Sequence, residues 1–370
     1  MKIAMIGQKG IPSRTGGIEI HVDEISRRLV QRGCEVNVYC RKSYCSISEQ
    51  GKYNGINIKF APYIKSKHLD AITHTFFSTM KALFSGCDIF HYHALGPSTL
   101  SFIPRLFGKK VVSTVHGLDW QRGKWGGFAS KYLKFGEYAS VRFAHRTISV
   151  SENLVDYFYG KYNKQIAYIP NGAEKHDKIE TDIIRSKYHL DKDGYILFLA
   201  RLVPEKGAHY LIDAYKQLKT DKKLVIAGGS SHSDDYEQQL HKQAGDHPNI
   251  IFTGFVTGKE LEELFSNAYL YVLPSDVEGL PISLLEAMSY GNCCLTSDIP
   301  ENAQVIGDMG YLFKKSDVND LSEKLQSLVD NVEMVDCKRT GAQDYIITKY
   351  NWDKAAEKTY ELYESLVNKR

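Results

Sequence analysis

Short apolar segments alternate with amphipathic helical patterns along this chain, and the alternation starts afresh near its middle. Such an order is typical of α/β domains built on parallel sheets. In the first half, strands are expected near 2–6, 35–40, 56–60, 88–92, 110–115, 146–150 and 166–169, and helices near 18–32, 68–84, 97–107, 127–143 and 151–160. In the second half, strands are expected near 195–200, 223–227, 249–253, 269–273 and 293–296, and helices from about 206 and near 317–330, 333–348 and 352–368.

The chain is expected to form two domains, because 370 residues are too many for one small core. A strong turn signal, Ile169-Pro170-Asn171-Gly172, precedes a polar stretch. We therefore expect one Rossmann-like domain over 1–172 and a second over 173–350, with a helix over 351–370. Two doubly wound sheets in tandem would face one cleft, and ligands bind beyond the carboxyl ends of such strands.

Charge is distributed unevenly between the two halves. Residues 1–180 carry a net charge of +12 and residues 181–370 a net charge of −9. The first half is expected to face an anionic membrane surface or a phosphate-bearing acceptor, and no motif suggests nucleic acid. A solvated surface bias without function is the alternative.

The N-terminus is expected to be a strand and not a signal peptide. No apolar stretch approaches the roughly 18 to 20 residues of a membrane span. Seven cysteines without disulfide spacing suggest free thiols in a reducing cytosol. These features predict a cytoplasmic protein, with a peripheral position on the inner face of the cytoplasmic membrane as a further expectation.

Two glutamates lie eight positions apart in the run from Asp276 to Met288. Pro281 suits the first position of a helix, which places Glu278 in the preceding loop and Glu286 in the second helical turn. The helix start offers N–H groups and a positive dipole end to a phosphate. The run therefore predicts a binding site for a nucleotide sugar.

A glycine-rich turn follows the first strand and includes Gly16 and Gly17, but it is not G-x-G-x-x-G. The second strand ends in Arg41 and not in the acidic residue that holds an NAD ribose, which disfavours a dehydrogenase. The two glycines allow the backbone to approach a diphosphate closely. A purely structural turn is about as consistent with this motif alone.

Two further strand ends carry polar residues. His116 follows a strand and precedes a glycine, so its imidazole can hydrogen-bond a sugar hydroxyl or the acceptor. Arg201 and Lys206 share the loop after the first strand of the second half. There the Arg201 guanidinium, which can donate two parallel hydrogen bonds, and the Lys206 ammonium can neutralise a departing diphosphate. Structural or solvated roles are the alternatives.

No metal and no cofactor are expected. Asp191-Lys192-Asp193 has the letters of an Asp-x-Asp motif but precedes a strand, so it is interpreted as a turn, and Asp234 as a helix start. His91 and His93 are interpreted as structural, because no third metal ligand presents itself.

The segment 69–84 is helical by period, with Leu69, Ile72, Phe76, Met80 and Leu83 on one face. We expect this face to be buried against the sheet, with a membrane-resting surface as the alternative.

Together these motifs resemble the family 4 retaining glycosyltransferases of the GT-B fold, over nearly the whole chain. The marks are the Gly16-Gly17 loop, His116, the Arg201/Lys206 pair and the Glu278/Glu286 pair. The run Lys9 to Arg14 is similar to a subgroup that serves capsular and exopolysaccharide assembly, some members of which are rhamnosyltransferases.

The resemblance implies a role for each residue. Glu286 would hold the donor ribose and Glu278 a sugar hydroxyl, while His116 would contact the donor sugar. Arg14 and Asp119 are the acceptor-side candidates. The diphosphate would be held by Arg201 and Lys206 with N–H groups of Gly16, Gly17, Gly279, Leu280 and Ile282. Many relatives have glycine where this chain has Pro281, which removes one such N–H.

The resemblance further implies a nucleotide-diphosphate sugar as donor, a lipid-linked or oligosaccharide acceptor, front-face transfer with retention, and no metal. The first domain would be the acceptor side, and the last helix would cross back onto it. The alternatives are a nucleotide-sugar epimerase, a phosphorylase-like enzyme, or a non-catalytic binder of sugar nucleotides.

Overall fold

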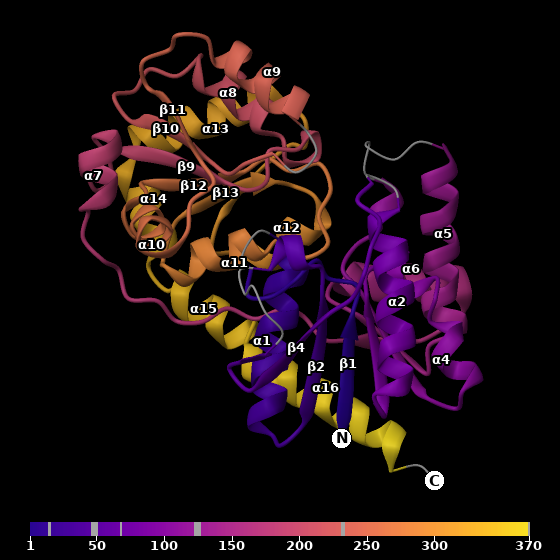
Figure 1. Cartoon of the computed structure of the whole chain (residues 1–370). Helices are drawn as coiled ribbons and strands as arrows, with labels where there is room; N and C mark the ends of the chain where they lie inside the picture. The colour runs from indigo at the N-terminus through magenta and orange to yellow at the C-terminus, as the bar shows by residue number, and fades with distance from the viewer. Residues whose placement is uncertain (14–15, 46–50, 67–68, 122–126, 231–233, 369–370) are drawn as a thin grey trace. The chain divides into compact units, whose positions relative to one another are not determined.

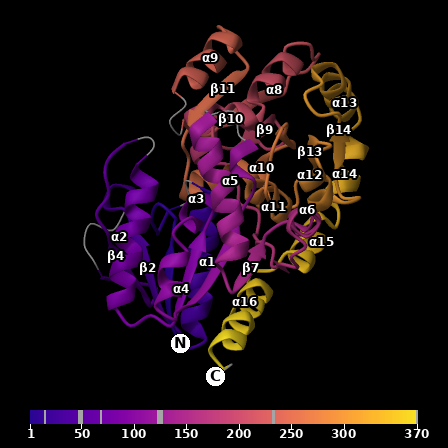
Figure 2. The ribbon, with the colours of Figure 1, turned by 90° about the vertical axis from the view of Figure 1, so that its right-hand side faces the viewer.

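The computed structural model describes residues 1–13, 16–45, 51–66, 69–121, 127–230 and 234–368. The chain forms two compact units (Figures 1 and 2). Unit 1 comprises Met1–Asn171 together with Trp352–Arg370, and unit 2 comprises Gly172–Asn351. Each unit contains its own sheet and its own core.

Unit 1 is built on an eight-stranded sheet of order β3-β4-β2-β1-β5-β6-β7-β8. All neighbouring strands are parallel except β3 and β4. The strands are β1 (Lys2–Ile6), β2 (Glu35–Cys40), β3 (Gly51–Tyr53), β4 (Ile56–Phe60), β5 (Ile89–His93), β6 (Lys110–Val115), β7 (Arg146–Ser149) and β8 (Ala167–Tyr168). The helices are α1 (Gly17–Gln31), α2 (Asp70–Phe84), α3 (Leu95–Ser98), α4 (Phe102–Leu106), α5 (Gly127–Arg142), α6 (Glu152–Tyr162) and α16 (Trp352–Val367).

Successive side chains of β1 point to opposite faces of this sheet, as strand geometry requires. Ile3 and Met5 join the core beneath α1 and α16, whereas Ala4 and Ile6 join the cluster that includes Ala82 of α2. Helices thus cover both faces of the sheet. This arrangement explains why the central strand β1 is an almost continuous apolar run, which the sequence pattern located well.

The C-terminal helix α16 packs on unit 1, as expected. Trp352, Ala356 and Tyr363 are buried in the same core as Ile25 of α1. At its start, Asp353 accepts a hydrogen bond from Nε of Arg28, at 2.6 Å. Figure 1 shows α16, in yellow, running beside α1 and the strands of unit 1.

Unit 2 is built on a fully parallel six-stranded sheet of order β11-β10-β9-β12-β13-β14. The strands are β9 (Tyr195–Leu199), β10 (Lys223–Ala227), β11 (Ile250–Gly254), β12 (Leu270–Leu273), β13 (Cys294–Ser297) and β14 (Tyr311–Phe313). The helices are α7 (Ile183–Tyr188), α8 (Ala208–Tyr215), α9 (Asp234–Ala244), α10 (Gly258–Asn267), α11 (Ile282–Ser289), α12 (Pro300–Ile306), α13 (Val318–Asp330), α14 (Val332–Arg339) and α15 (Ala342–Lys349).

Both sheets are doubly wound. In each one the first strand of the unit is central, and the strand order reverses beside it, between β1 and β5 in unit 1 and between β9 and β12 in unit 2. Ligands of open α/β sheets bind at this switch point, beyond the carboxyl ends of the strands. The loops after these four strands are therefore the places where functional residues are expected.

Two predicted helices are each broken in two. The helix expected at 97–107 is split into α3 and α4, because Pro104 has no N–H to donate and cannot continue a regular helix through that turn. The helix expected at 333–348 is split into α14 and α15 at Gly341, whose φ of +82° ends the helical path. The short elements β3, α7, α12 and β14 were not predicted.

Helix α2 buries a different face from the one expected. Its buried residues are polar or small, namely His74, Thr75, Ser78, Thr79 and Ala82. Of the face expected to be buried, Leu69 and Phe76 are exposed, whereas Ile72, Met80 and Leu83 are half-buried. Phe77 and Phe84, beside that face, are exposed as well. The polar face is accommodated by hydrogen bonds: Thr75 and Thr79 donate to carbonyls one turn earlier, and Thr79 Oγ1 lies 2.9 Å from the Tyr92 hydroxyl. Among the described residues, no helix has the length and apolarity needed to cross a membrane.

The buried imidazole of His74 should make unit 1 sensitive to acid. Burial, reinforced by the Arg41 cation, lowers the pKa of His74 to about 3. Below about pH 6.5, His74 is therefore protonated in the unfolded chain but stays neutral in the folded state. Stability is lost as the pH falls from there towards 3. At pH 5 this single group should cost about 2 kcal/mol.

Urea unfolding at pH 8 and pH 5 tests this expectation. In His74→Gln, the loss of unfolding free energy between the two pH values should be about 2 kcal/mol smaller than in the wild type. His241→Gln, which removes an exposed histidine of unit 2, is the matched control. An unchanged pH dependence in His74→Gln would contradict the assignment.

Candidate active site

In unit 2, the loops after β9 and β12 are held in direct contact. Gly207 has a φ of +71°, and a Cβ at this position would clash with the carbonyl oxygen of Pro274. The Asp276 N–H also donates to the Glu205 carbonyl at 2.9 Å. The two loops flanking the switch point therefore pack directly against each other, and this contact requires glycine at position 207.

Lys206 and Glu278 form an ion pair across these two loops. Ser275 Oγ donates to the same Oε1 of Glu278, at 2.7 Å. The Lys206 and Glu278 side chains are only 14% and 7% exposed, so water screens the pair weakly. Removing one partner of such a pair leaves the other charge uncompensated, which costs about 3–5 kcal/mol at buried sites. The fold thus brings two of the predicted site residues into contact.

Helix α11 begins one residue later than predicted. Pro281 is its N-cap, with φ −75° and ψ 98°, and Ile282 is the first helical residue. The Pro281 carbonyl still accepts hydrogen bonds from the Leu284 and Leu285 N–H groups, so proline ends the loop without weakening the helix start. Glu286 is the fifth helical residue and lies, half-buried, in the second turn.

The start of α11 lies directly after the β12 loop. Gly279 and Leu280 are buried between Glu278 and the helix. Tyr271, fully buried on β12, donates to the Leu199 carbonyl at 3.1 Å and lies 2.9 Å from Ser283 Oγ. This side chain ties the first turn of α11 to the end of β9, and so fixes the positive end of the helix dipole at the switch point.

Arg201 follows β9 by two residues and is half-buried on the same loop as Lys206. Its cation therefore lies on the β9 side of the switch point, as the sequence predicted. Arg201, Lys206, Glu278, Gly279, Leu280, Ile282 and Glu286 thus all belong to two connected segments of unit 2.

In unit 1, Gly16 and Gly17 lie at the N-terminus of α1, as its N-cap and first residue. A Cβ on Gly16 would clash with Oε2 of Glu19, whose Oε1 accepts the Lys9 N–H at 2.9 Å. A larger residue at 16 would therefore require this buried carboxylate, the far end of a flexible side chain, to shift. Arg14 lies outside the described residues.

His116 lies directly after β6, half-buried, with Asp119 three residues further on at the start of the short helix η2 (Asp119–Gln121). Nε2 of His116 lies 3.3 Å from Nδ1 of His93, and its ring lies 4.8 Å from the ring of His21. Sequence reasoning did not single out His21. Its position on α1, four residues after Gly17, was the available signal, because that first turn follows the central strand.

The neighbouring imidazoles are neutral at physiological pH. Burial lowers the pKa of His21 to about 4, although a hydrogen bond with Asn171 opposes the shift. Burial likewise lowers the pKa of His91 and of His93. Both nitrogens of His91 face hydroxyls, of Tyr363 at 2.5 Å and of Thr114 at 2.7 Å, which agrees with its interpretation as a structural residue. His21, His91 and His93 therefore offer hydrogen bonds and lone pairs, not charge.

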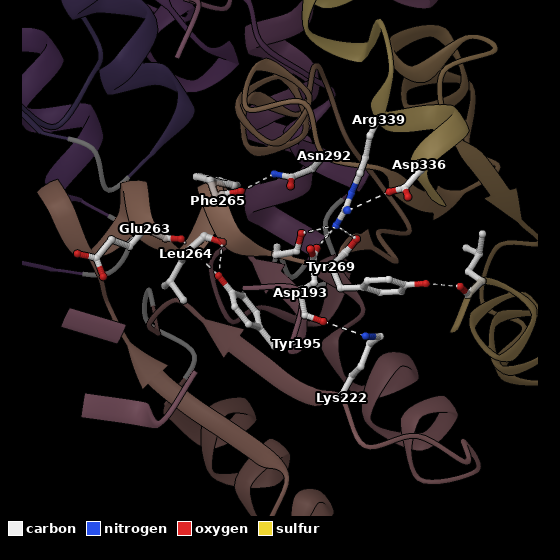
Figure 3. Close-up of polar contacts among 12 residues, drawn as sticks. Asp193, Tyr195, Lys222, Glu263, Leu264, Phe265, Tyr269, Asn292, Asp336 and Arg339 are labelled. Carbon is white, nitrogen blue, oxygen red and sulfur yellow. Dashed lines mark hydrogen bonds and ion pairs between the residues drawn. The ribbon is translucent and has the colours of Figure 1, made fainter. Parts of the chain in front are cut away.

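The Asp-x-Asp letters at 191–193 belong to a structural turn, as expected. Figure 3 shows Asp193 directed at Arg339 of α14, with which it forms an ion pair. Arg339 also donates to the carbonyls of Ala268 and Tyr269, at 3.0 and 2.9 Å. Asp191 accepts a hydrogen bond from Nε of Arg185 at 2.8 Å. Both carboxylates therefore brace the beginning of β9, at the end of the sheet opposite the switch-point loops.

Two family models match consecutive parts of the chain. Glycosyltransferase Family 4 matches residues 15–176, and Glycosyl transferases group 1 matches residues 180–344. The chain belongs to the glycosyltransferases. Among its relatives, an uncharacterized glycosyltransferase of Methanocaldococcus jannaschii is 28% identical and is covered over 98% of both chains. The O-antigen chain mannosyltransferase B of Escherichia coli is also 28% identical, over 50% of this chain and 49% of the relative.

Solved structures agree on the fold. Sucrose-phosphate synthase of Thermosynechococcus elongatus superposes with a TM-score of 0.86, at 19% identity, over all of both chains. An Anabaena protein solved in complex with UDP-glucose superposes with a TM-score of 0.81, at 17% identity, over 99% of this chain and all of that one. This glycosyltransferase accordingly has the GT-B fold that the sequence motifs implied.

The contact between the two loops of this glycosyltransferase predicts a large effect of Gly207→Ala. The positive φ alone costs an L-residue about 1–2 kcal/mol, and the clash with Pro274 adds to it. We expect unit 2 to lose about 3 kcal/mol or more of unfolding free energy. In Gly245→Ala, the φ of +62° is similar but the Cβ meets open space, so a loss of about 1 kcal/mol is expected. Equal losses in the two variants, measured by urea unfolding, would contradict the role given to the contact.

Proposed function

We propose that this glycosyltransferase transfers a hexosyl or rhamnosyl group, with retention and without a metal, from a nucleotide-diphosphate sugar to a lipid-linked or oligosaccharide acceptor. The process it serves is the assembly of a cell-surface polysaccharide, capsular or exopolysaccharide. The observation that carries the proposal is the Lys206–Glu278 pair at the switch point of unit 2.

The relatives support this substrate class. One is named as an O-antigen chain mannosyltransferase, and another, of Campylobacter jejuni, as an N-acetylgalactosaminyltransferase acting on a diphospho-undecaprenol-linked sugar. The latter is 25% identical over 62% of both chains. The similar Anabaena structure holds UDP-glucose, which supports a nucleotide-sugar donor.

In the proposed mechanism, the ion pair changes partners when the donor binds. The donor diphosphate takes Lys206 and Arg201 as its cations, which frees an oxygen of Glu278 to accept a hydrogen bond from the transferred sugar. Ser275 continues to orient that carboxylate. Glu286, one helical turn into α11, accepts from the ribose hydroxyls, and the α11 dipole favours the negative charge of the leaving group.

The bond that breaks joins the anomeric carbon to a diphosphate oxygen, which keeps the electron pair. The acceptor hydroxyl attacks the same face of the sugar, and its proton passes to the departing phosphate. Unit 1 is proposed to contribute His116, as a hydrogen-bond partner of the donor sugar, and the N–H groups of Gly16 and Gly17. Arg14 and Asp119 are proposed to serve the acceptor.

Release of nucleoside diphosphate distinguishes this function from its alternatives. An epimerase or a non-catalytic binder releases none, and a phosphorylase-like enzyme requires inorganic phosphate. A thermal-shift screen against UDP-, GDP- and dTDP-sugars first identifies the donor, since a bound donor raises apparent stability.

With that donor and a lipid-linked acceptor, Glu278→Gln and Lys206→Met should each lower kcat/KM by about 100-fold or more. The control is Glu260→Gln, which removes the partner of the exposed Lys187 in the same unit, outside the switch-point loops, and should leave kcat/KM within about twofold. Full activity in both site variants would refute the assignment. EDTA should leave the activity intact, and a complete loss reversed by added metal would contradict metal independence.

We also propose that unit 1 rests on an anionic membrane through α2, α4 and α5. Large apolar side chains on and beside these helices are exposed, above all Phe84, Leu106, Phe107 and Phe128, which are 86%, 78%, 66% and 87% exposed. Figure 1 shows the three helices on the same side of the sheet. Ring contacts of Phe143 with Phe102 and Tyr138, at 5.9 and 6.3 Å, link α4 to α5.

The charges on these helices suit an anionic surface. Their cations are Lys81, Arg105, Lys131, Lys134 and Arg142. Their acidic residues are paired with cations: Asp70 forms an ion pair with Arg41, and the fully buried Glu137 forms one with Lys161. A face with exposed aromatic rings and unopposed positive charge fits an interface lined by anionic headgroups.

Vesicle flotation tests the membrane proposal. The wild type should bind vesicles rich in phosphatidylglycerol at low salt and leave them at high salt. Phe77→Ser combined with Phe84→Ser should reduce partitioning by about tenfold or more, because two apolar side chains no longer enter the interface. The control is Phe255→Ser, which removes a 56% exposed phenylalanine from unit 2. Absence of binding by the wild type at low salt would refute the proposal.

A further inference from the structure

Three histidines from separate elements of unit 1 converge at the switch point between β1 and β5. His21 comes from the first turns of α1, His93 ends β5, and His116 follows β6. One ring nitrogen of each lies within 4.8 Å of one ring nitrogen of both others. Among the described residues, this is the group of histidine, cysteine or acidic side chains that is close enough to hold a metal ion.

The hydrogen-bond partners fix where two of the lone pairs lie. Nδ1 of His21 lies 2.7 Å from Oδ1 of Asn171, and an amide oxygen only accepts, so Nδ1 carries the hydrogen and Nε2 the lone pair. Nε2 of His93 lies 3.5 Å from the Met5 thioether, which also only accepts, so Nδ1 of His93 carries the lone pair. Such partners on the far nitrogen are what orient metal-bound imidazoles.

The spacing suits a small tetrahedral ion. Zinc–nitrogen bonds of about 2.0–2.1 Å place neighbouring nitrogens about 3.3–3.4 Å apart. Nδ1 of His93 and Nε2 of His116 are 3.3 Å apart, so this pair already has the required separation. His21 and His93 are buried, whereas His116 is half-buried and leaves a side from which an ion can enter.

We propose that His21, His93 and His116 form a binding site for zinc, with the fourth position open. Three imidazoles without a carboxylate favour zinc and the late first-row transition metals cobalt, nickel and copper over magnesium, calcium or manganese. In the metal-free protein, the hydrogen between His93 and His116 lies on Nε2 of His116, because Nδ1 of His93 is the acceptor. When zinc binds, His116 changes tautomer: the hydrogen moves from Nε2 to Nδ1 through solvent, so the imidazole stays neutral and Nε2 presents its lone pair to the ion.

Zinc at this site also regulates the enzyme. Because the ion occupies Nε2 of His116, it withdraws this imidazole from the donor sugar and inhibits transfer. This second statement rests on the proposed function, whereas the binding of zinc does not.

Binding is measured on the full chain with cobalt as a spectroscopic probe and with zinc in competition against a fluorescent chelator. We expect one equivalent of cobalt to give the intense visible absorption of a tetrahedral site, and zinc to displace it. His116→Ala should weaken zinc binding by at least about 100-fold, and Asn171→Ala, which leaves all three ligands in place, by about 10- to 100-fold.

The matched control is His145→Ala, which removes a half-buried histidine of unit 1 outside the cluster. His145 accepts the Val111 N–H at 3.0 Å, so this variant also tests the loss of a structural imidazole, and it should bind zinc as the wild type does. Thermal unfolding confirms that each variant is folded. Zinc binding that is absent in the wild type, or unchanged in a folded His116→Ala, overturns the site.

The activity arm separates the two statements. If the donor assay succeeds, zinc should inhibit the wild type, and His21→Gln should resist inhibition while retaining activity. Binding without inhibition refutes the regulatory statement alone. An enzyme that releases no nucleoside diphosphate but still binds cobalt refutes the proposed function and leaves the zinc site standing.

Discussion

The approach of Gly207 to the carbonyl of Pro274 is the constraint on which the site of unit 2 depends. It allows the loops after β9 and β12 to touch, and only then can Lys206 reach Glu278 across the switch point. This weakly screened ion pair holds a cation and a carboxylate side by side, where we propose that they bind the diphosphate and the sugar of the donor. The backbone thus prepares the electrostatics before any ligand arrives, which is the condition for stabilising charge that develops during a reaction.

The sequence predicted the sheets well and the helix surfaces poorly, for physical reasons. Strands buried on both faces are continuous apolar runs, and Tyr195 to Leu199 could hardly be anything else. Helix α2 has a clear apolar stripe, but a stripe does not reveal whether it meets the sheet or the outside. Here the hydroxyls of Thr75 and Thr79 donate hydrogen bonds to backbone carbonyls of the same helix, so a polar face can be buried.

The positions of the candidate site residues were predictable wherever strand ends supply them. Arg201, Lys206, Glu278 and His116 lie in the expected loops, because a parallel sheet gathers its carboxyl ends along one edge. Pro281 was placed one residue too far into its helix. His21 was missed because it reaches the histidine cluster from the side of a helix, and only the packing of α1 reveals this. The segment from Asp191 to Asp193 was correctly predicted to be a turn, because it precedes a strand even though it matches the Asp-x-Asp motif.

Helix α16 has a consequence for the order in which the protein assembles. Trp352 and Tyr363 fill the core of unit 1, and the Tyr363 hydroxyl lies 2.5 Å from His91 on a central strand. These residues are synthesised after unit 2, although they complete the core of unit 1, whose other elements precede unit 2 in the chain. During translation, part of the apolar core of unit 1 therefore stays uncovered until unit 2 and α16 have left the ribosome. A nascent chain of this topology needs protection for longer than one whose domains each close on their own residues.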